Sequence, residues 1–374
     1  MKYYIIAGEA SGDLHASNLM KQLKEKDPEA EFRCWGGDRM KNQGAHLVKH
    51  INELAFMGFW EVFINLKTIL KNIKLCKQDI LAYRPDVLIL IDYPGFNLRM
   101  AEFAKKNGIK TVYYISPQVW AWKQSRVKKI RRYVDKMLVI LPFEKAFYAR
   151  FNYEVEFTGH PLLDAISREK ETLDSVQFRK VNNLPDKPLV AILPGSRRQE
   201  ITKMLKVMIA AAGRFPQYQF VIAGIEGLSE DFYRGFTEKE NVSIVYGQTY
   251  PLLASAHAAM VASGTATLET ALFEVPQVVC YKAGKVSFHI AKRLVKVKYI
   301  SLVNLIMDRE VVKELIQEEF NEAELANRLE LLLHDKTYRE ELKNQYRELK
   351  EKLGGEGASK KAAGIIHNFL KNEA

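Results

Sequence analysis

The sequence has few cysteines and no long apolar segment, and both absences narrow the class of protein. Its 374 residues include three cysteines, Cys34, Cys76 and Cys280, which are far apart and fit no metal-ligand spacing. A disulfide framework and a structural zinc site are therefore not expected, whereas a reducing cytoplasmic setting is. No stretch approaches the roughly 20 apolar residues of a membrane-spanning helix, and the first apolar run is too short for a signal peptide.

Acidic residues are in the minority. The chain has 56 Lys and Arg against 45 Asp and Glu, which gives a formal net charge of +11. This excess suits an anionic partner such as nucleic acid, an acidic membrane or a phosphorylated substrate, and it equally suits general solubility. The cations do not form one clustered stripe, so we do not expect a nucleic-acid partner.

Short apolar runs followed by small-residue turns recur along the chain and predict an α/β fold. The strands are expected within 3–7, 32–37, 85–92, 110–115, 137–144, 155–162, 189–193, 220–224, 242–245, 256–262 and 277–281. The chain is too long for one ordinary core. We predict two Rossmann-like, doubly wound domains facing a cleft, one of residues 1–165 completed by a C-terminal helix at 345–374, the other of residues 166–344.

Two carboxylates follow predicted strands of the first domain. Glu9 lies in the turn after 3–7, and Asp92 ends the apolar run 85–92. Open α/β sheets bind ligands at the carboxyl ends of their strands. Asp92 is therefore the first candidate for a general base, and Glu9 either orients the acceptor or is the base itself. The alternative for Asp92 is a cap for the next helix.

Four further residues of the first domain lie in loops where an acceptor pocket is expected. Ser11 and Asp13 share the turn of Glu9, and Asp13 suits a helix cap equally well. Gln118 and Trp120 follow the predicted strand 110–115, in a loop whose aromatic content is unusual for a plain connection. Such a loop suits a sugar or lipid pocket.

The second domain carries glycine turns between strands and helices. Ser263 is expected to cap a helix, and Gly264 lets a ligand approach the main chain. Arg197, in a similar turn, adds a fixed positive charge suited to a diphosphate. Glu269, one helical turn further on, is placed to bind sugar hydroxyls. The helix dipole and free N–H groups favour a phosphate; the alternative is a plain helix cap. The residues of that first turn are Gly264, Thr265, Ala266 and Thr267.

Large apolar side chains crowd the region 54–64, and lysines follow it. The combination suits a helix that lies on an anionic bilayer, with aromatic rings in the interface and lysines at the headgroups. The alternative is a globular core. The expected membrane contacts are Phe56, Met57, Phe59, Trp60 and Phe63, and the lysines are Lys67, Lys71, Lys74 and Lys77.

Several motifs together resemble those of the lipid-A-disaccharide synthase family, over nearly the whole chain. They are AGEASGD at 7–13, YISPQVWAW at 114–122, LPFE at 141–144, GHPL at 159–162, LPGSR at 193–197 and SGTATLE at 263–269. The resemblance implies an inverting glycosyltransferase of the GT-B fold, in lipopolysaccharide biosynthesis of a Gram-negative bacterium. It would transfer 2,3-diacylglucosamine from UDP-2,3-diacylglucosamine to 2,3-diacylglucosamine 1-phosphate, giving UDP and a β(1→6) disaccharide 1-phosphate.

The resemblance also implies where the enzyme acts and what it needs. It would be cytoplasmic and attached peripherally to the inner membrane, with no cofactor and no metal, since no Asp-x-Asp-like pair ends a strand. A homodimer stays one alternative for its oligomeric state. Rival functions are a UDP-sugar epimerase, a glycosyltransferase of peptidoglycan synthesis and a nucleic-acid binder.

The same resemblance assigns the donor and shows two departures from the family pattern. UDP would occupy the second domain, with Asn304 and Gln317 contacting the donor. The family stretch Asp-Ala-Pro-Asp-Phe-Asn reads DYPGFN at 92–97, which keeps the first Asp and replaces the second by Gly95. That favours Asp92 as the essential carboxylate. The family Leu-Pro-Asn reads Leu-Val-Asn at 302–304, which keeps Asn304.

Overall fold

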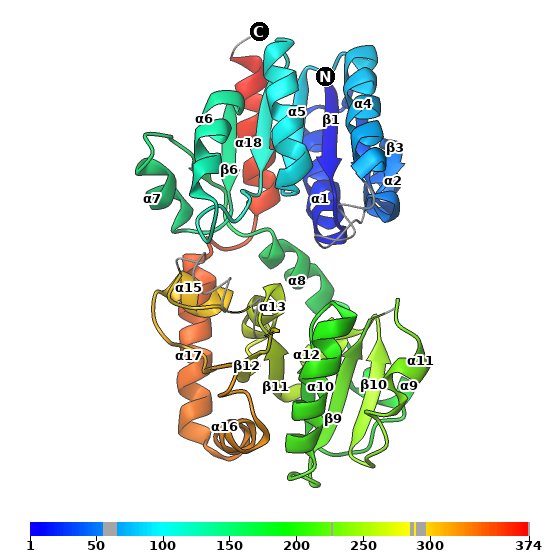
Figure 1. Ribbon diagram of the computed structural model, residues 1–374, viewed down its shortest axis with the longest axis vertical. Coiled ribbons are helices and arrows are strands. Elements are labelled where there is room, and N and C mark those ends of the chain that lie inside the picture. Colours follow the sequence, from blue (N-terminus) through cyan, green and yellow to red (C-terminus); the bar gives the residue numbers. More distant parts are fainter. Residues whose placement is uncertain (55–65, 226, 285–287, 289–296, 373–374) are drawn as a thin grey trace. The chain divides into compact units, whose positions relative to one another are not determined.

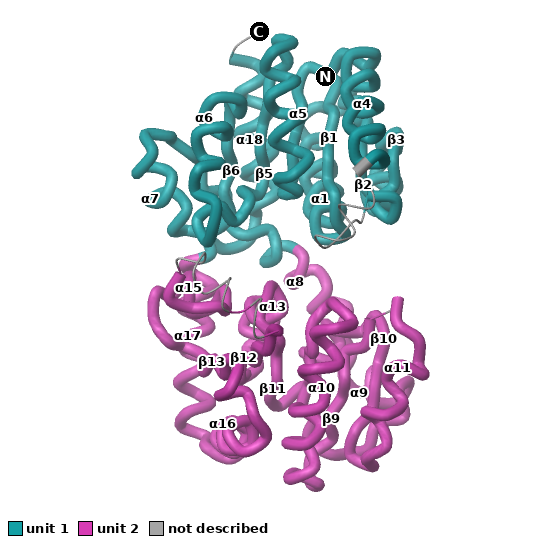
Figure 2. Tube along the Cα trace, in the orientation of Figure 1, with its two compact units in different colours: residues 1–164, 353–374 teal, residues 165–352 magenta. Residues whose placement is uncertain are grey.

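The computed structural model describes residues 1–54, 66–225, 227–284, 288 and 297–372. The chain divides into two compact units, residues 1–164 with 353–374 and residues 165–352 (Figure 2). Each unit is built on a parallel sheet flanked by helices (Figure 1). The prediction of two Rossmann-like domains is confirmed.

The first unit contains a seven-stranded sheet in the order β3-β2-β1-β4-β5-β6-β7, with parallel neighbours throughout. Its elements are β1 (Lys2–Ala7), α1 (Ala10–Lys26), β2 (Glu31–Gly36), α2 (Asp38–Asn42), β3 (His46–His50), η1 (Ile51–Glu53), α4 (Leu66–Tyr83), β4 (Val87–Ile91), α5 (Pro94–Lys106), β5 (Lys110–Tyr114), η2 (Gln124–Arg126), α6 (Val127–Tyr133), β6 (Lys136–Val139), α7 (Glu144–Ala149), β7 (Glu156–Phe157) and α18 (Ala358–Lys371). The sequence boundary between the units falls within α8 (Leu162–Lys170).

The second unit contains a six-stranded parallel sheet in the order β10-β9-β8-β11-β12-β13. Its elements are α9 (Ser175–Val181), β8 (Leu189–Leu193), α10 (Arg198–Ala212), β9 (Gln219–Gly224), α11 (Glu230–Arg234), β10 (Val242–Tyr246), α12 (Thr249–Ser255), β11 (Ala256–Ala262), α13 (Thr265–Leu272), β12 (Gln277–Tyr281), α15 (Leu302–Met307), β13 (Glu314–Ile316), α16 (Glu322–His334) and α17 (Lys336–Lys352).

The strand sequences explain why these sheets are buried. All five residues of β4, Val-Leu-Ile-Leu-Ile, are buried, as are all five of β8. Both faces of a parallel sheet are covered, so its central strands are apolar without alternation. The edge strand β3, which the sequence did not predict, is half-buried and reads His-Leu-Val-Lys-His. Because three of its five residues are polar, it lacks the apolar run by which the other strands were predicted.

The chain returns to the first unit at Leu353, later than the 345 expected, because α17 continues to Lys352. Gly354 and Gly355 then adopt positive φ (90° and 70°) and break the helix. Residues 345–374 therefore contain the end of α17 and the whole of α18, which belong to different units. The carboxylate of Asp164 accepts hydrogen bonds from the N–H groups of Gly357 and Ser359 and so caps α18.

Strand order locates the ligand edge of each sheet. The first sheet is wound outward from β1, through β2 and β3 on one side and from β4 to β7 on the other. The second sheet is wound in the same way from β8, with β9 and β11 as its neighbours. Ligands of such sheets bind beyond the carboxyl ends of the strands at this change of direction. The turns after β1 and β4, and those after β8 and β11, therefore lie where a ligand is expected.

Candidate functional site

The first sheet brings Glu9 and Asp92 together at its change of direction. Ala7 of β1 pairs with Ile91 of β4, and the two carboxylates follow these residues. Burial and, second, the charge of Glu9 raise the pKa of Asp92 to about 6, while the N–H of Tyr93 lowers it. A carboxylate that titrates this close to neutrality is suited to accept a proton in a reaction.

The main chain at Asp92 is strained. Asp92 and Tyr93 have φ of 41° and 48°, a left-handed conformation that non-glycine residues rarely adopt. The ring of Tyr93 stacks on Phe96 with 5.6 Å between centroids, and lies so close to Gly8 that a Cβ there would come within 2.4 Å of it. Gly8 is therefore required where the turn after β1 meets the turn after β4. Such strain is found mainly at functional sites.

Asp13 has a structural role in this arrangement. One carboxylate oxygen accepts hydrogen bonds from the N–H groups of Gly37 (2.7 Å) and Met40 (3.2 Å), and the other from that of Arg39 (3.1 Å). Asp13 thus caps α2, a helix that follows the neighbouring strand. We therefore replace its expected acceptor contact by this capping role, while Ser11, in the same turn, is exposed.

Gln118 and Trp120 both lie in the loop after β5 but differ in exposure. Gln118 is exposed, whereas Trp120 is 8% exposed and packs edge-on against Phe143 with 5.1 Å between ring centroids. Of these two residues, only Gln118 offers its side chain to solvent, so we retain Gln118 as an acceptor candidate and give Trp120 a packing role.

Glu144 is a buried carboxylate that the sequence reasoning did not single out as a site residue. It accepts hydrogen bonds from the N–H groups of Ile140 (3.2 Å) and Leu141 (2.9 Å). Burial raises its pKa to about 7, against the lowering effect of these N–H groups, Ser116 and Trp120. Glu144 therefore holds the turn that leads into α7; its place in the LPFE motif was the available signal.

The second sheet presents a glycine turn and a helix start after β11. Gly264, with φ of 153°, occupies the N-cap position of α13, and no side chain of the described residues caps it. A Cβ on Gly264 would meet no atom within 4 Å, so space for a ligand is open there. The expectation that Ser263 caps the helix is corrected, because its hydroxyl donates to the carbonyl of Ile300 (2.8 Å).

Only part of the first turn of α13 is accessible to a ligand. Thr265 is exposed and Ala266 half-buried, whereas Thr267 is buried and uses both its N–H and its hydroxyl on the Gly264 carbonyl. Glu269 is half-buried and accepts a hydrogen bond from Tyr250 (2.9 Å). Burial raises the pKa of Glu269 despite this bond.

Arg197 lies in the matching turn after β8, at the N-cap position of α10. Its side chain is 66% exposed and forms an ion pair with Glu200 (3.0 Å). Exposed pairs of this kind are weak, so an anionic ligand can compete for the guanidinium. Arg197 and Gly264 thus follow adjacent strands, as Glu9 and Asp92 do in the first sheet.

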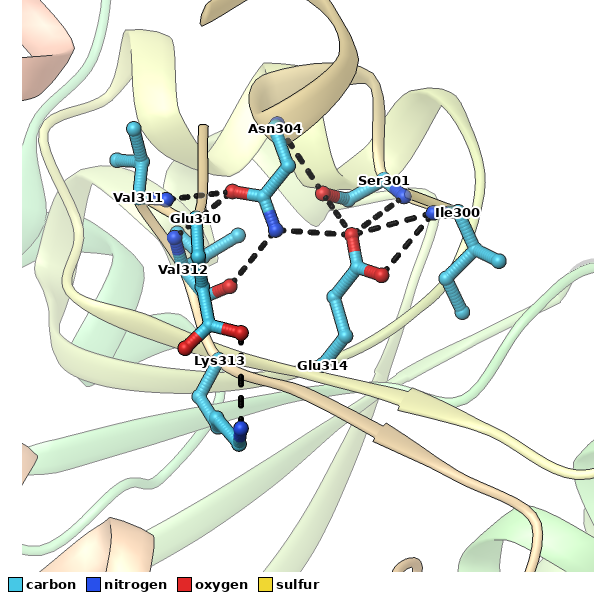
Figure 3. Close-up of polar contacts among 8 residues, drawn as sticks. All are labelled: Ile300, Ser301, Asn304, Glu310, Val311, Val312, Lys313 and Glu314. Atoms are coloured by element: carbon cyan, nitrogen blue, oxygen red, sulfur yellow. Dashed lines mark hydrogen bonds and ion pairs between the residues drawn. The ribbon is translucent and has the colours of Figure 1, made fainter. Parts of the chain in front are cut away.

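Asn304 is completely buried and its side-chain amide is fully engaged within the protein (Figure 3). Its oxygen accepts hydrogen bonds from the N–H groups of Val311 (2.8 Å) and Val312 (2.9 Å). Its nitrogen donates to the Val312 carbonyl and to Glu314, both at 2.9 Å. This leaves no polar atom for the donor, so we replace the expected contact by a structural role.

The carboxylate of Glu314 is the centre of this network (Figure 3). Besides Asn304, it accepts hydrogen bonds from the N–H groups of Ile300 and Ser301 and from the Ser301 hydroxyl (2.7 Å). Because the Ile300 carbonyl accepts from Ser263, the network supports the turn that precedes Gly264.

Gln317 lies at the end of β13 with a left-handed main chain (φ 55°). Its N–H donates to the Tyr281 carbonyl (2.9 Å), and its side-chain oxygen accepts from the N–H of Ala283 (3.2 Å). Gln317 therefore shapes the loop after β12 and is half-buried.

The membrane contacts expected from the sequence fall outside the described residues. These are Phe56, Met57, Phe59, Trp60 and Phe63. None of the helices in the part of the chain that the structure describes is long and apolar enough to cross a bilayer. Over the same residues, no group of three or more His, Cys, Asp or Glu is arranged to hold a metal ion.

Comparison with known proteins gives one family over nearly the whole chain. The family model described as "Lipid-A-disaccharide synthetase" matches residues 3–367. The lipid-A-disaccharide synthase of Coxiella burnetii (strain CbuG_Q212) is 38% identical over 371 residues, 98% of each chain. That of Syntrophus aciditrophicus (strain SB) is 39% identical over 377 residues, 98% of this chain and 97% of the relative.

Solved structures show the same fold at low identity. A UDP-GlcNAc 2-epimerase from Neisseria meningitidis, bound to UDP-GlcNAc, superimposes with a TM-score of 0.70 at 14% identity and covers 100% of both chains. The kitacinnamycin glycosyltransferase gives 0.67 at 14% identity, with 99% of both chains covered. At this identity the likeness concerns the fold alone.

Proposed function

The chain belongs to the lipid-A-disaccharide synthetase family, and we propose from that membership that it performs the disaccharide-forming step of lipid A biosynthesis. The donor is UDP-2,3-diacylglucosamine and the acceptor is 2,3-diacylglucosamine 1-phosphate. The products are UDP and the β(1→6)-linked disaccharide 1-phosphate.

Asp92 is the general base in this proposal. It removes the proton from the acceptor 6-hydroxyl as that oxygen attacks the anomeric carbon of the donor, and the bond to UDP breaks on the opposite face, which inverts the centre. The observation that supports this role is the raised pKa of Asp92, about 6, beside Glu9 at the ligand edge of the first sheet. Glu9 orients the acceptor.

The second unit binds UDP in this proposal. The diphosphate lies at the start of α13, where Gly264 leaves open space and Thr265 is exposed. Arg197 adds a positive charge, and together with the helix dipole it stabilises the charge of the departing UDP. The half-buried carboxylate of Glu269 binds the ribose hydroxyls.

An acceptor-dependence assay tests the activity. The purified protein is given UDP-2,3-diacylglucosamine with or without 2,3-diacylglucosamine 1-phosphate, and UDP and disaccharide are quantified. We expect equal amounts of both products, and only when the acceptor is present. An epimerase would instead convert a UDP-sugar without any acceptor, and that outcome would contradict the proposal.

We also propose that the protein binds the cytoplasmic face of the inner membrane peripherally, through α4 and the residues before it. Leu70, Leu75 and Leu81 of this helix are 55%, 40% and 45% exposed, among exposed lysines. The only acidic residue in the sequence of α4, Asp79, is bound by Arg33 and is therefore not available to repel lipid. Apolar side chains among lysines suit an anionic interface.

A flotation assay with anionic vesicles tests this surface. Replacing Leu70, Leu75 and Leu81 by Ser should reduce binding to vesicles that contain phosphatidylglycerol. The matched control replaces Val176 and Val181 of α9, which are more exposed (74% and 61%), and should leave binding unchanged. Equal binding of both variants would contradict the role of α4.

A further inference from the structure

The candidate base lies on a main chain that needs external support. Asp92 and Tyr93 are consecutive residues with left-handed φ, and neither is glycine. Such a conformation persists only where the surroundings hold it in place. Two buried side chains from other elements reach the main-chain carbonyl of Asp92.

Asn97 is the first of these side chains. It lies near the start of α5, is completely buried, and its amide nitrogen donates to the carbonyl of Asp92 (2.8 Å). The same nitrogen is 3.1 Å from the carbonyl oxygen of Ile91 and 3.4 Å from that of Ile6. Ile91 and Ile6 belong to β4 and β1, the strands that lead to Asp92 and Glu9. One amide thus links the ends of both strands.

Tyr113 is the second. It lies on β5, paired with Leu90 of β4, and its side chain is fully buried. Its hydroxyl donates to the carbonyl of Asp92. Burial holds the pKa of Tyr113 far above its ordinary value, so the hydroxyl keeps its proton and remains a donor. The Asp92 carbonyl is therefore held from α5 and from β5.

We propose that Asn97 and Tyr113 are positioning residues for Asp92, which hold its main chain so that its half-buried carboxylate stays beside Glu9. This inference rests on the proposed role of Asp92 as the general base. Neither side chain touches the reacting atoms, and both act through the Asp92 carbonyl. Without them, the turn relaxes towards unstrained angles and water reaches the carboxylate.

The test compares Tyr113→Phe with Tyr114→Phe. The first change removes a single hydroxyl that bonds Asp92, and the second removes the hydroxyl of the next residue on β5, which is equally buried and does not bond Asp92. Two quantities are followed: the pH dependence of kcat/KM, and the titration of the Asp92 carboxyl by carbon-13 NMR.

Tyr113→Phe should move both midpoints from about 6 towards the ordinary range of an Asp, because hydration favours the charged form. It should also lower kcat about tenfold, the effect of one hydrogen bond on a barrier, with the KM for the UDP donor unchanged. Tyr114→Phe should match the wild type in every measurement. Unchanged midpoints in Tyr113→Phe would overturn the proposal.

A second variant and a second outcome keep the two proposals separable. Asn97→Ala removes the other support and should shift the carboxyl midpoint in the same direction; an unchanged midpoint in this variant would contradict the role of Asn97. If the NMR midpoint of Asp92 moves but the acid limb of kcat/KM does not follow it, the positioning role stands and Asp92 is not the base. UDP affinity, which the proposed function assigns to the second unit, should be unchanged in both variants, and the urea denaturation midpoint of each variant shows whether the first unit is folded.

Discussion

The two sheets are wound in the same way but carry opposite chemistry at their ligand edges. In the first, the turns after the two central strands hold the carboxylates Glu9 and Asp92. In the second, the equivalent turns hold Gly195 and Gly264, each followed by a helix start, with Arg197 beside them. Topology therefore fixes where a ligand is received, and the few residues of each turn decide which charge is favoured there.

The two ligand edges also differ in the residues that carry a positive φ. Positive φ occurs at both edges, on Asp92 and Tyr93 in the first unit and on Gly195 (108°) and Gly264 (153°) in the second. Glycine takes this conformation without strain. In the proposed function Asp92 needs its side chain to accept a proton, so the first unit keeps the strain. The proposed diphosphate site is formed by the main chain, which needs no side chain at Gly195 and Gly264.

Removing the carboxylate of Asp92 should give the largest effect. Asp92→Asn keeps the size of the side chain and abolishes its ability to accept a proton, so kcat should fall about 10²–10⁴-fold. The UDP affinity, which the proposed function assigns to the second unit, should not change. Steady-state kinetics and UDP titration measure the two quantities.

Glu9→Gln is the matched partner of this variant. Since Glu9 raises the pKa of Asp92, its neutralisation should shift the acid limb of kcat/KM to lower pH and reduce activity less than Asp92→Asn does. The sign follows from the base being active when deprotonated, so the rate falls below the pKa. Near-normal turnover of Asp92→Asn together with an inactive Glu9→Gln would reverse the two assignments.

Arg197→Ala should have the second largest effect, and on the donor. A guanidinium that binds phosphate contributes about 1.5–3 kcal/mol, so the donor KM should rise about 10- to 100-fold while the acceptor KM stays the same. Arg198→Ala is the control, because that adjacent side chain lies over the ring of Phe232, 5.1 Å from its centroid. Equal effects of both variants would show only loss of general positive charge.

Sequence patterns were sufficient for the two folds and for the edge where the carboxylates meet. β1 and β4 are apolar runs, and the βαβ rules bring their ends together, which places Glu9 beside Asp92. Sequence patterns did not predict the role of polar side chains that form hydrogen bonds with another element. Asp13 caps a helix after another strand, and Asn304 bonds residues beyond its own helix. Residue type alone does not distinguish such a bond from a ligand contact.

Glu314→Gln should have the smallest effect. It tests the comparison because the two units stabilise the turns at their ligand edges with different groups. The first unit uses a neutral amide, Asn97, and the second a buried carboxylate that accepts from Ile300, Ser301 and Asn304. A glutamine offers one oxygen and turns an NH₂ group towards these donors, which should lower the free energy of unfolding by about 1–3 kcal/mol.

The change should also reach the UDP turn, because Ile300 accepts the hydrogen bond of Ser263. We expect the donor KM to rise about 3- to 10-fold and the acceptor KM to stay constant, measured beside urea denaturation. Glu318→Gln, at an exposed position on the same segment, should change neither. A lower free energy of unfolding with an unchanged donor KM would mean that Glu314 stabilises the fold but does not affect UDP binding at the turn before Gly264. The two sheets would then differ both in the charge of their ligand edges and in whether the buried residues behind each edge influence ligand binding.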